Sequence, residues 1–231
     1  MPTVPEDKLI TIVIFSEALE FIDAARNCIQ EMQKVLPVED RETSSAPVVG
    51  ALLTVCLQHC DSMLILAKTG SNDASIEALF RPAVESAFRL VWLCEKEDRA
   101  YKITKGEVHF PGLSQLMRRT IKGPIHIDGN HTVTHLHELA HAGIAQLKQH
   151  FREERLKRKD SERPIVLVAV GLLAMFLAWL ACLSFCSFNK RMADVGKITA
   201  IFNQLMAPAS KVCITLLSSP FPPEDLPHIA L

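Results

Sequence analysis

The sequence predicts an all-α protein, a single bundle of about six or seven helices with a very apolar central helix near the C-terminus. Almost every apolar stretch repeats with the 3.6-residue period of a helix, most clearly at 76–92, where apolar positions alternate in steps of three and one. With one tyrosine in 231 residues, the composition is unlike that of a strand-rich sandwich. Hydrophobic residues make up 48% of the chain, enough for a sizeable core. We predict one helical domain over 1–219 and a Pro-rich tail over 220–231.

Prolines, glycines and polar caps delimit the expected helices. We expect helices over residues 7–35, 47–68, 73–97, 113–120, 130–158, 165–188 and 190–217. Pro5 and Pro37 bracket the first helix, and Gly70 stops the second. Ser71-Asn72-Asp73 can cap the third helix, and Pro82 within it should bend the helix because it leaves a backbone carbonyl without its N–H partner.

Breaks also separate the later helices. Pro111-Gly112 and Gly123-Pro124 isolate the short fourth helix. The fifth helix has an apolar arc along one side, in which Gly143 allows another helix to approach closely. The last helix ends before Pro220, where the tail begins.

The apolar run at 165–188 contains 24 residues without a charge and qualifies by length as a membrane-spanning helix. Basic residues flank both of its ends, so they favour no orientation in a membrane. The other helices carry broad apolar faces that need a common partner, which favours a buried central helix. A single-pass protein of the inner membrane, anchored through 165–188, is the alternative.

The overall charge and the cysteines constrain the class of protein. Twenty-five basic and 26 acidic residues give a formal charge of −1, which excludes a strongly basic protein that binds nucleic acid over its whole surface. The seven cysteines are scattered in apolar runs and lack C-x-x-C spacing, so we expect buried thiols in a reducing compartment. The N-terminus lacks a basic region and a cleavage site, and we predict a cytoplasmic protein.

The string His137-Glu138-Leu139-Ala140-His141 matches H-E-x-x-H. In that motif two histidines one turn apart bind zinc, and the glutamate is the general base. Ile144 and Leu147 stand where metzincins continue with glycine and histidine, and no strand is predicted to hold a substrate. We expect no cofactor. The alternative is a zinc metalloprotease with His137 and His141 as ligands and Glu138 as base.

A stripe of alternating charge runs along the third predicted helix, with Glu77, Arg81, Glu85 and Arg89 four residues apart. Such a stripe is typical of a solvated helix face with i,i+4 ion pairs. A helical wheel also places Arg81 and Glu85 beside Trp92, at the edge of the buried arc. We therefore predict a partly buried polar site formed by Arg81 and Glu85 together with His141 of the fifth helix.

The third and fifth predicted helices resemble segments of a known protein family. The pattern L-x-R-P-x-x-E-x-x-x-R-x-x-W-L at 79–93, the Lys105-Gly106 step and H-x-G-x-x-Q-L at 141–147 resemble an uncharacterised bacterial family of all-helical proteins. The match covers about residues 24 to 205. It implies that 165–188 is a helix of the bundle and that the H-E-x-x-H match is incidental.

More distantly, the pairing of an R-P-x-x-E helix with a histidine helix is similar to HEPN-like abortive-infection proteins, all-α ribonuclease toxins that often dimerise. This resemblance implies a defence-associated ribonuclease or interaction role, RNA as a partner and a homodimer. In that role His141 would be the base for attack by a 2′-hydroxyl, Arg81 would hold the phosphate and Glu85 would orient Arg81. His141 itself departs from the R-x(4–6)-H pattern of those proteins, because residues 134–136 include no arginine.

Overall fold

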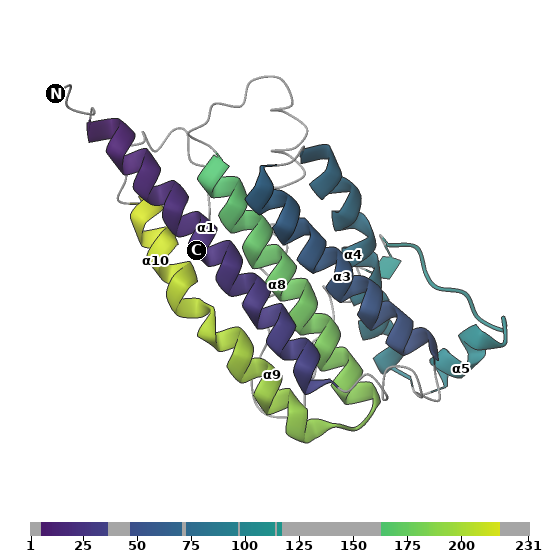
Figure 1. The fold of residues 1–231 in the computed structure, drawn as a ribbon. Helices are drawn as coiled ribbons and strands as arrows, with labels where there is room; N and C mark the ends of the chain where they lie inside the picture. The colour runs from purple at the N-terminus through teal and green to yellow at the C-terminus, as the bar shows by residue number, and fades with distance from the viewer. Residues whose placement is uncertain are drawn as a thin grey trace.

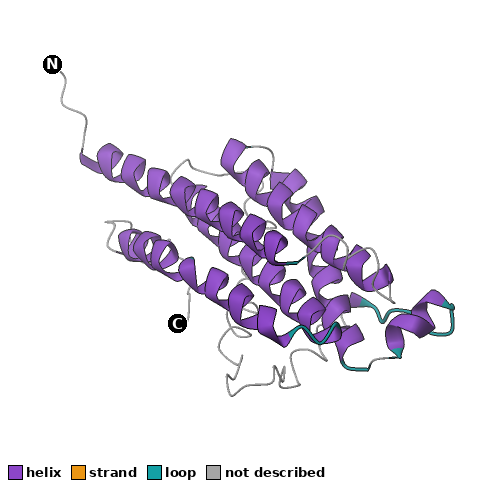
Figure 2. Cartoon of the chain, turned by 60° about the horizontal axis from the view of Figure 1, so that its bottom comes forward, coloured by secondary structure: helices purple, strands orange, loops and turns teal. Residues whose placement is uncertain are grey.

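The computed structural model describes residues 6–36, 47–70, 73–96, 98–113, 115–116 and 163–217, and within these ranges the secondary structure is helical, with no strand. This confirms the predicted all-α class. The helices are α1 (Glu6–Val35), α3 (Pro47–Thr69), α4 (Asp73–Cys94), α5 (Arg99–Thr104), α8 (Arg163–Phe188), α9 (Met192–Gln204) and α10 (Met206–Leu217). The long helices lie side by side along one direction, as two views of the chain show (Figures 1 and 2).

The apolar helix α8 lies at the centre of this bundle. It packs against α1, α3, α4 and α9, and in Figure 1 it runs between α1 and α3. Both α8 and α3 are long and apolar enough to cross a membrane, but 89% of the apolar window of α8 is buried by its neighbours, against 50% for α3. A helix that is apolar on all sides is stable in this position because other helices cover most of its surface.

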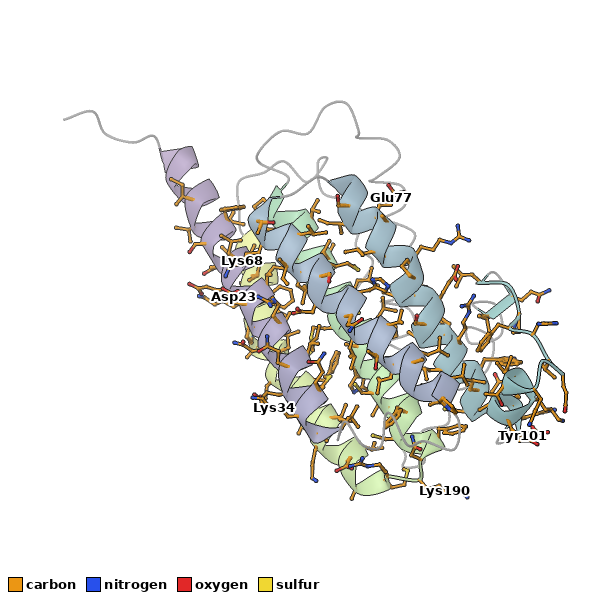
Figure 3. All side chains as sticks on the ribbon, turned by 45° about the vertical axis from the view of Figure 1, so that its right-hand side comes forward. Asp23, Lys34, Lys68, Glu77, Tyr101 and Lys190 are labelled. Atoms are coloured by element: carbon orange, nitrogen blue, oxygen red, sulfur yellow. The ribbon has the colours of Figure 1, made fainter. Side chains whose placement is uncertain are left out.

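Ion pairs join the outer helices across the surface of the bundle. Arg26 Nε lies 2.8 Å from Asp61 Oδ1, and Lys68 Nζ lies 2.6 Å from Asp23 Oδ1, so α1 and α3 are paired at two levels. Figure 3 shows Asp23 and Lys68 next to each other. Position 23 pairs with 68 and position 26 with 61, which means that the two helices run in opposite directions. Ion pairs at the surface add little to stability, and the buried apolar faces hold the bundle together.

Two details of the predicted helices were wrong. The helix expected at 190–217 is divided into α9 and α10 at Leu205, because Pro208 has no N–H to donate to the carbonyl of Gln204 and its ring clashes there. The third helix ends at Cys94 and is followed by the short α5, which was not predicted. Only Ala100 of α5 is buried, so this helix has no apolar period that a sequence pattern could detect.

Pro82 lies inside α4, which continues as a helix on both sides of it. The hydroxyl of Ser86 donates to the carbonyl oxygen of Pro82 at 2.7 Å. The predicted helix at 130–158, most of the one at 113–120 and the tail at 220–231 lie outside the described residues.

Candidate functional site

The candidate site is a row of three charged side chains on α4. Glu85 is shared between two arginines: Arg81 Nε donates to its Oε1 at 3.0 Å, and Arg89 Nη2 donates to its Oε2 at 3.1 Å. Both arginines are four residues from Glu85, the spacing that places side chains on one face of a helix. Two guanidinium groups and one carboxylate leave this row with one net positive charge.

Burial differs strongly along the row. The side chain of Arg81 is 77% exposed, that of Glu85 is 20% exposed and that of Arg89 is 33% exposed. The carboxylate therefore lies at the edge of the core, while the guanidinium of Arg81 extends into solvent. Because the Arg81 bond uses Nε, its two Nη groups remain available to an incoming anion.

Aromatic rings continue the row toward α5. The Cζ atom of Arg89 lies 5.0 Å from the ring centre of Phe110, and Phe110 is tilted against Trp92 with ring centres 5.7 Å apart. On the indole of Trp92 lies a second cation, with Arg99 Cζ 4.3 Å from the ring centre. Arg99 also donates to the backbone oxygen of Trp92 and to Glu95. The loop that follows α5 is in this way attached to α4.

The predicted pair of Arg81 and Glu85 is present, and Glu85 lies at the core edge as expected. Arg81 itself is mostly exposed, and it is not the partly buried group that the helical wheel suggested. His137, Glu138 and His141 lie outside the described residues, so the approach of His141 to Arg81 stays a prediction. The contact of Arg89 with Phe110 was not predicted, since Phe110 follows α5 and no periodic pattern relates it to α4.

The described residues contain no group of three or more histidine, cysteine or acidic side chains that could hold a metal. The thiols of Cys56 and Cys60 lie together in the core between α3 and α8. A hydrogen bond with Cys56 and, to a smaller extent, burial raise the pKa of Cys60 well above its ordinary value. Burial likewise raises the pKa of Cys94 to about 12. Cys60 and Cys94 therefore stay protonated and act as small apolar groups, as the sequence predicted.

Comparisons of the chain with protein-family models, with curated proteins and with solved structures gave no match.

Proposed function

We propose that this protein acts on RNA as a HEPN-like, defence-associated ribonuclease, with Arg81, Glu85 and His141 as its site residues. The observation that carries the proposal is the exposed guanidinium of Arg81, which Glu85 holds through Nε. An arginine that is fixed in this way can offer both Nη groups to one phosphate without losing much side-chain entropy on binding. The role given to Glu85, to orient Arg81, agrees with this contact.

The proposed reaction is a transesterification within the RNA chain. His141 takes the proton of the 2′-hydroxyl, the 2′-oxygen attacks the neighbouring phosphorus, and the bond from phosphorus to the 5′-oxygen breaks. The leaving 5′-oxygen takes a proton from water. Arg81 stabilises the negative charge that develops on the phosphate oxygens. The products are a 2′,3′-cyclic phosphate and a 5′-hydroxyl, and no metal takes part.

The proposed location is the cytoplasm, with α8 as the core helix of a soluble bundle. The burial of 89% of the apolar window of α8 by other helices supports this location over a single-pass anchor. Fractionation of cells tests it: a protein that stays with membranes after a carbonate wash would contradict the proposal. The proposed role also includes a homodimer. Sedimentation equilibrium without detergent should then give twice the chain mass of 25.7 kDa.

A cleavage assay with purified protein tests the activity. Arg81→Ala and His141→Ala should each lower the rate of RNA cleavage by about 100-fold, the lower end of the effect of losing an acid–base or charge-stabilising group. Lys34→Ala is the matched control, because Lys34 also belongs to an exposed ion pair but lies on α1, across the bundle from α4 (Figure 3). The Lys34→Ala variant should cleave RNA at the wild-type rate. EDTA should not change the rate of either protein. Loss of RNA cleavage in EDTA would mean that the reaction needs a metal ion, which contradicts the proposed metal-free mechanism.

A further inference from the structure

We infer that Arg89 is a positioning residue, which fixes the carboxylate of Glu85 and thereby the orientation of Arg81. Glu85 has two oxygens, and each accepts from a different arginine, at 3.0 Å from Arg81 and 3.1 Å from Arg89. When Arg89 holds Oε2, the other oxygen is directed toward Arg81. A glutamate that is held on one side only would rotate about its last torsion, which has broad and shallow minima.

Arg89 can act as the fixed end of this row because an aromatic ring holds it. Its guanidinium lies against the ring of Phe110, 5.0 Å from Cζ to the ring centre, and Phe110 in turn rests against the buried Trp92. Arg81, at the other end, is 77% exposed, and no aromatic ring within the described ranges lies against its guanidinium. Each side chain is therefore held by the one before it. Phe110, which rests against the core, holds Arg89. Arg89 holds Glu85, and Glu85 in turn holds Arg81.

The hydrogen bonds of Arg89 indicate that its presence costs stability. Its Nε is buried and has no hydrogen-bond partner among the described residues, and the same holds for the indole nitrogen of Trp92, one turn away. A buried donor without an acceptor is unfavourable for folding, and an apolar side chain of similar length would remove that cost. If the side chain at position 89 had only a structural role, methionine there would give a more stable protein than arginine.

The inference rests on the proposed function for its effect on RNA, but the position of Arg81 can be measured without RNA. In ¹H–¹⁵N spectra of the full chain, the Nε–H signal of Arg81 reports its hydrogen bond to Glu85 through its exchange with water. Arg89→Met should speed this exchange about two- to fivefold, the factor expected for losing one cation–π and ion-pair contact near the surface. Phe110→Leu should act in the same direction. Tyr101→Leu, which removes the separate contact of Lys105 with the Tyr101 ring, should have no effect.

Stability and RNA affinity complete the test. Arg89→Met should melt at or above the wild-type temperature and yet bind a short single-stranded oligoribonucleotide about two- to fivefold more weakly. In the background of Arg81→Ala, adding Arg89→Met should weaken binding no further.

Unchanged exchange at Arg81 in both Arg89→Met and Phe110→Leu overturns the inference, as does a full additional loss in the double variant, which would mean that Arg89 contacts RNA directly. If the wild type neither binds nor cleaves RNA, the proposed function is wrong, and the exchange of Arg81 Nε–H still decides the role of Arg89.

Discussion

Gly171 of α8 lies directly against the ring of Phe21 in α1. A Cβ atom at position 171 would overlap Cε1 of Phe21 and lie 3.0 Å from its Cδ1, with Ile22 Cδ1 at 3.3 Å. Phe21 is fully buried, so its ring has little room to move away. The missing side chain at 171 thus sets how closely the central helix can approach α1.

Gly171→Ala should therefore lower the free energy of unfolding by about 1–3 kcal/mol, the usual cost of overpacking a core. Gly196→Ala is the matched control, because a Cβ atom at position 196 of α9 meets nothing within 4 Å. Alanine favours a helix interior by about 1 kcal/mol over glycine, so the control should be stabilised. Urea unfolding of both variants measures the difference, and equal midpoints would show that α1 and α8 do not meet at Gly171.

Lys190 ends α8 in a left-handed conformation, with a φ of 56°. The N–H of Arg191 donates back to the carbonyl of Cys186 at 2.8 Å, which closes the helix as a glycine cap would. Lys190→Gly should raise the unfolding free energy by about 1 kcal/mol, because glycine adopts this φ without steric cost. Gly106→Ala, at a φ of 71° after α5, should have the opposite sign. A destabilised Lys190→Gly variant in thermal melts would contradict the capped turn.

Local patterns were sufficient for the fold class. Helical periodicity is a property of neighbouring residues, so α1, α3, α4 and α8 could be predicted close to their observed bounds. The division at Leu205 also had a signal in the sequence, since Pro208 lies in the interior of the predicted last helix. The short α5 had none, because a single buried residue makes no period.

The candidate site was predictable only in part, for the same reason. The spacing of Arg81, Glu85 and Arg89 follows from one turn of helix, and their ion pairs could be expected. The position of Phe110 depends on how the chain returns to α4 after α5. That return is a tertiary contact between two segments that share no helical period. The spacing of residues in the sequence therefore could not predict it.

Asp194, in the first turn of α9, should make the stability depend on acid. A hydrogen bond from Lys197 lowers its pKa below the ordinary value, burial opposes this, and a further bond from Arg191 adds to the lowering. A carboxyl whose pKa is lower in the folded than in the unfolded chain stabilises the fold above its unfolded pKa, and the effect is lost as the pH falls through the folded pKa.

Asp194→Asn should therefore unfold more easily than the wild type at neutral pH, by about 1 kcal/mol. The difference in unfolding free energy between the two proteins should shrink as the pH falls below about 4. There the carboxyl of Asp194 becomes protonated, first in the unfolded chain and then in the folded one. Denaturant unfolding across this pH range measures it. A deficit that is the same at all pH values would mean that the charge of Asp194 plays no part.

The described thiols should resist modification in the native protein. They are Cys28, Cys56, Cys60, Cys94, Cys182 and Cys186. Burial raises the pKa of Cys94 and of Cys186 to about 12, so almost no thiolate forms at mildly alkaline pH. Iodoacetamide should label these positions only after denaturation, as peptide mass spectrometry can show for each site. Rapid labelling of the native chain at Cys56 or Cys60 would mean that the α3–α8 interface opens readily.

The chemistry of the RNA ends is the most direct test of the central claim that Arg81, Glu85 and His141 form a metal-independent ribonuclease site. After incubation of RNA with the purified protein in EDTA, mass spectrometry of the products should show 2′,3′-cyclic phosphate and 5′-hydroxyl ends. These ends should be reduced about 100-fold in Arg81→Ala and His141→Ala. Intact RNA, or products with 5′-phosphate ends, would contradict the account.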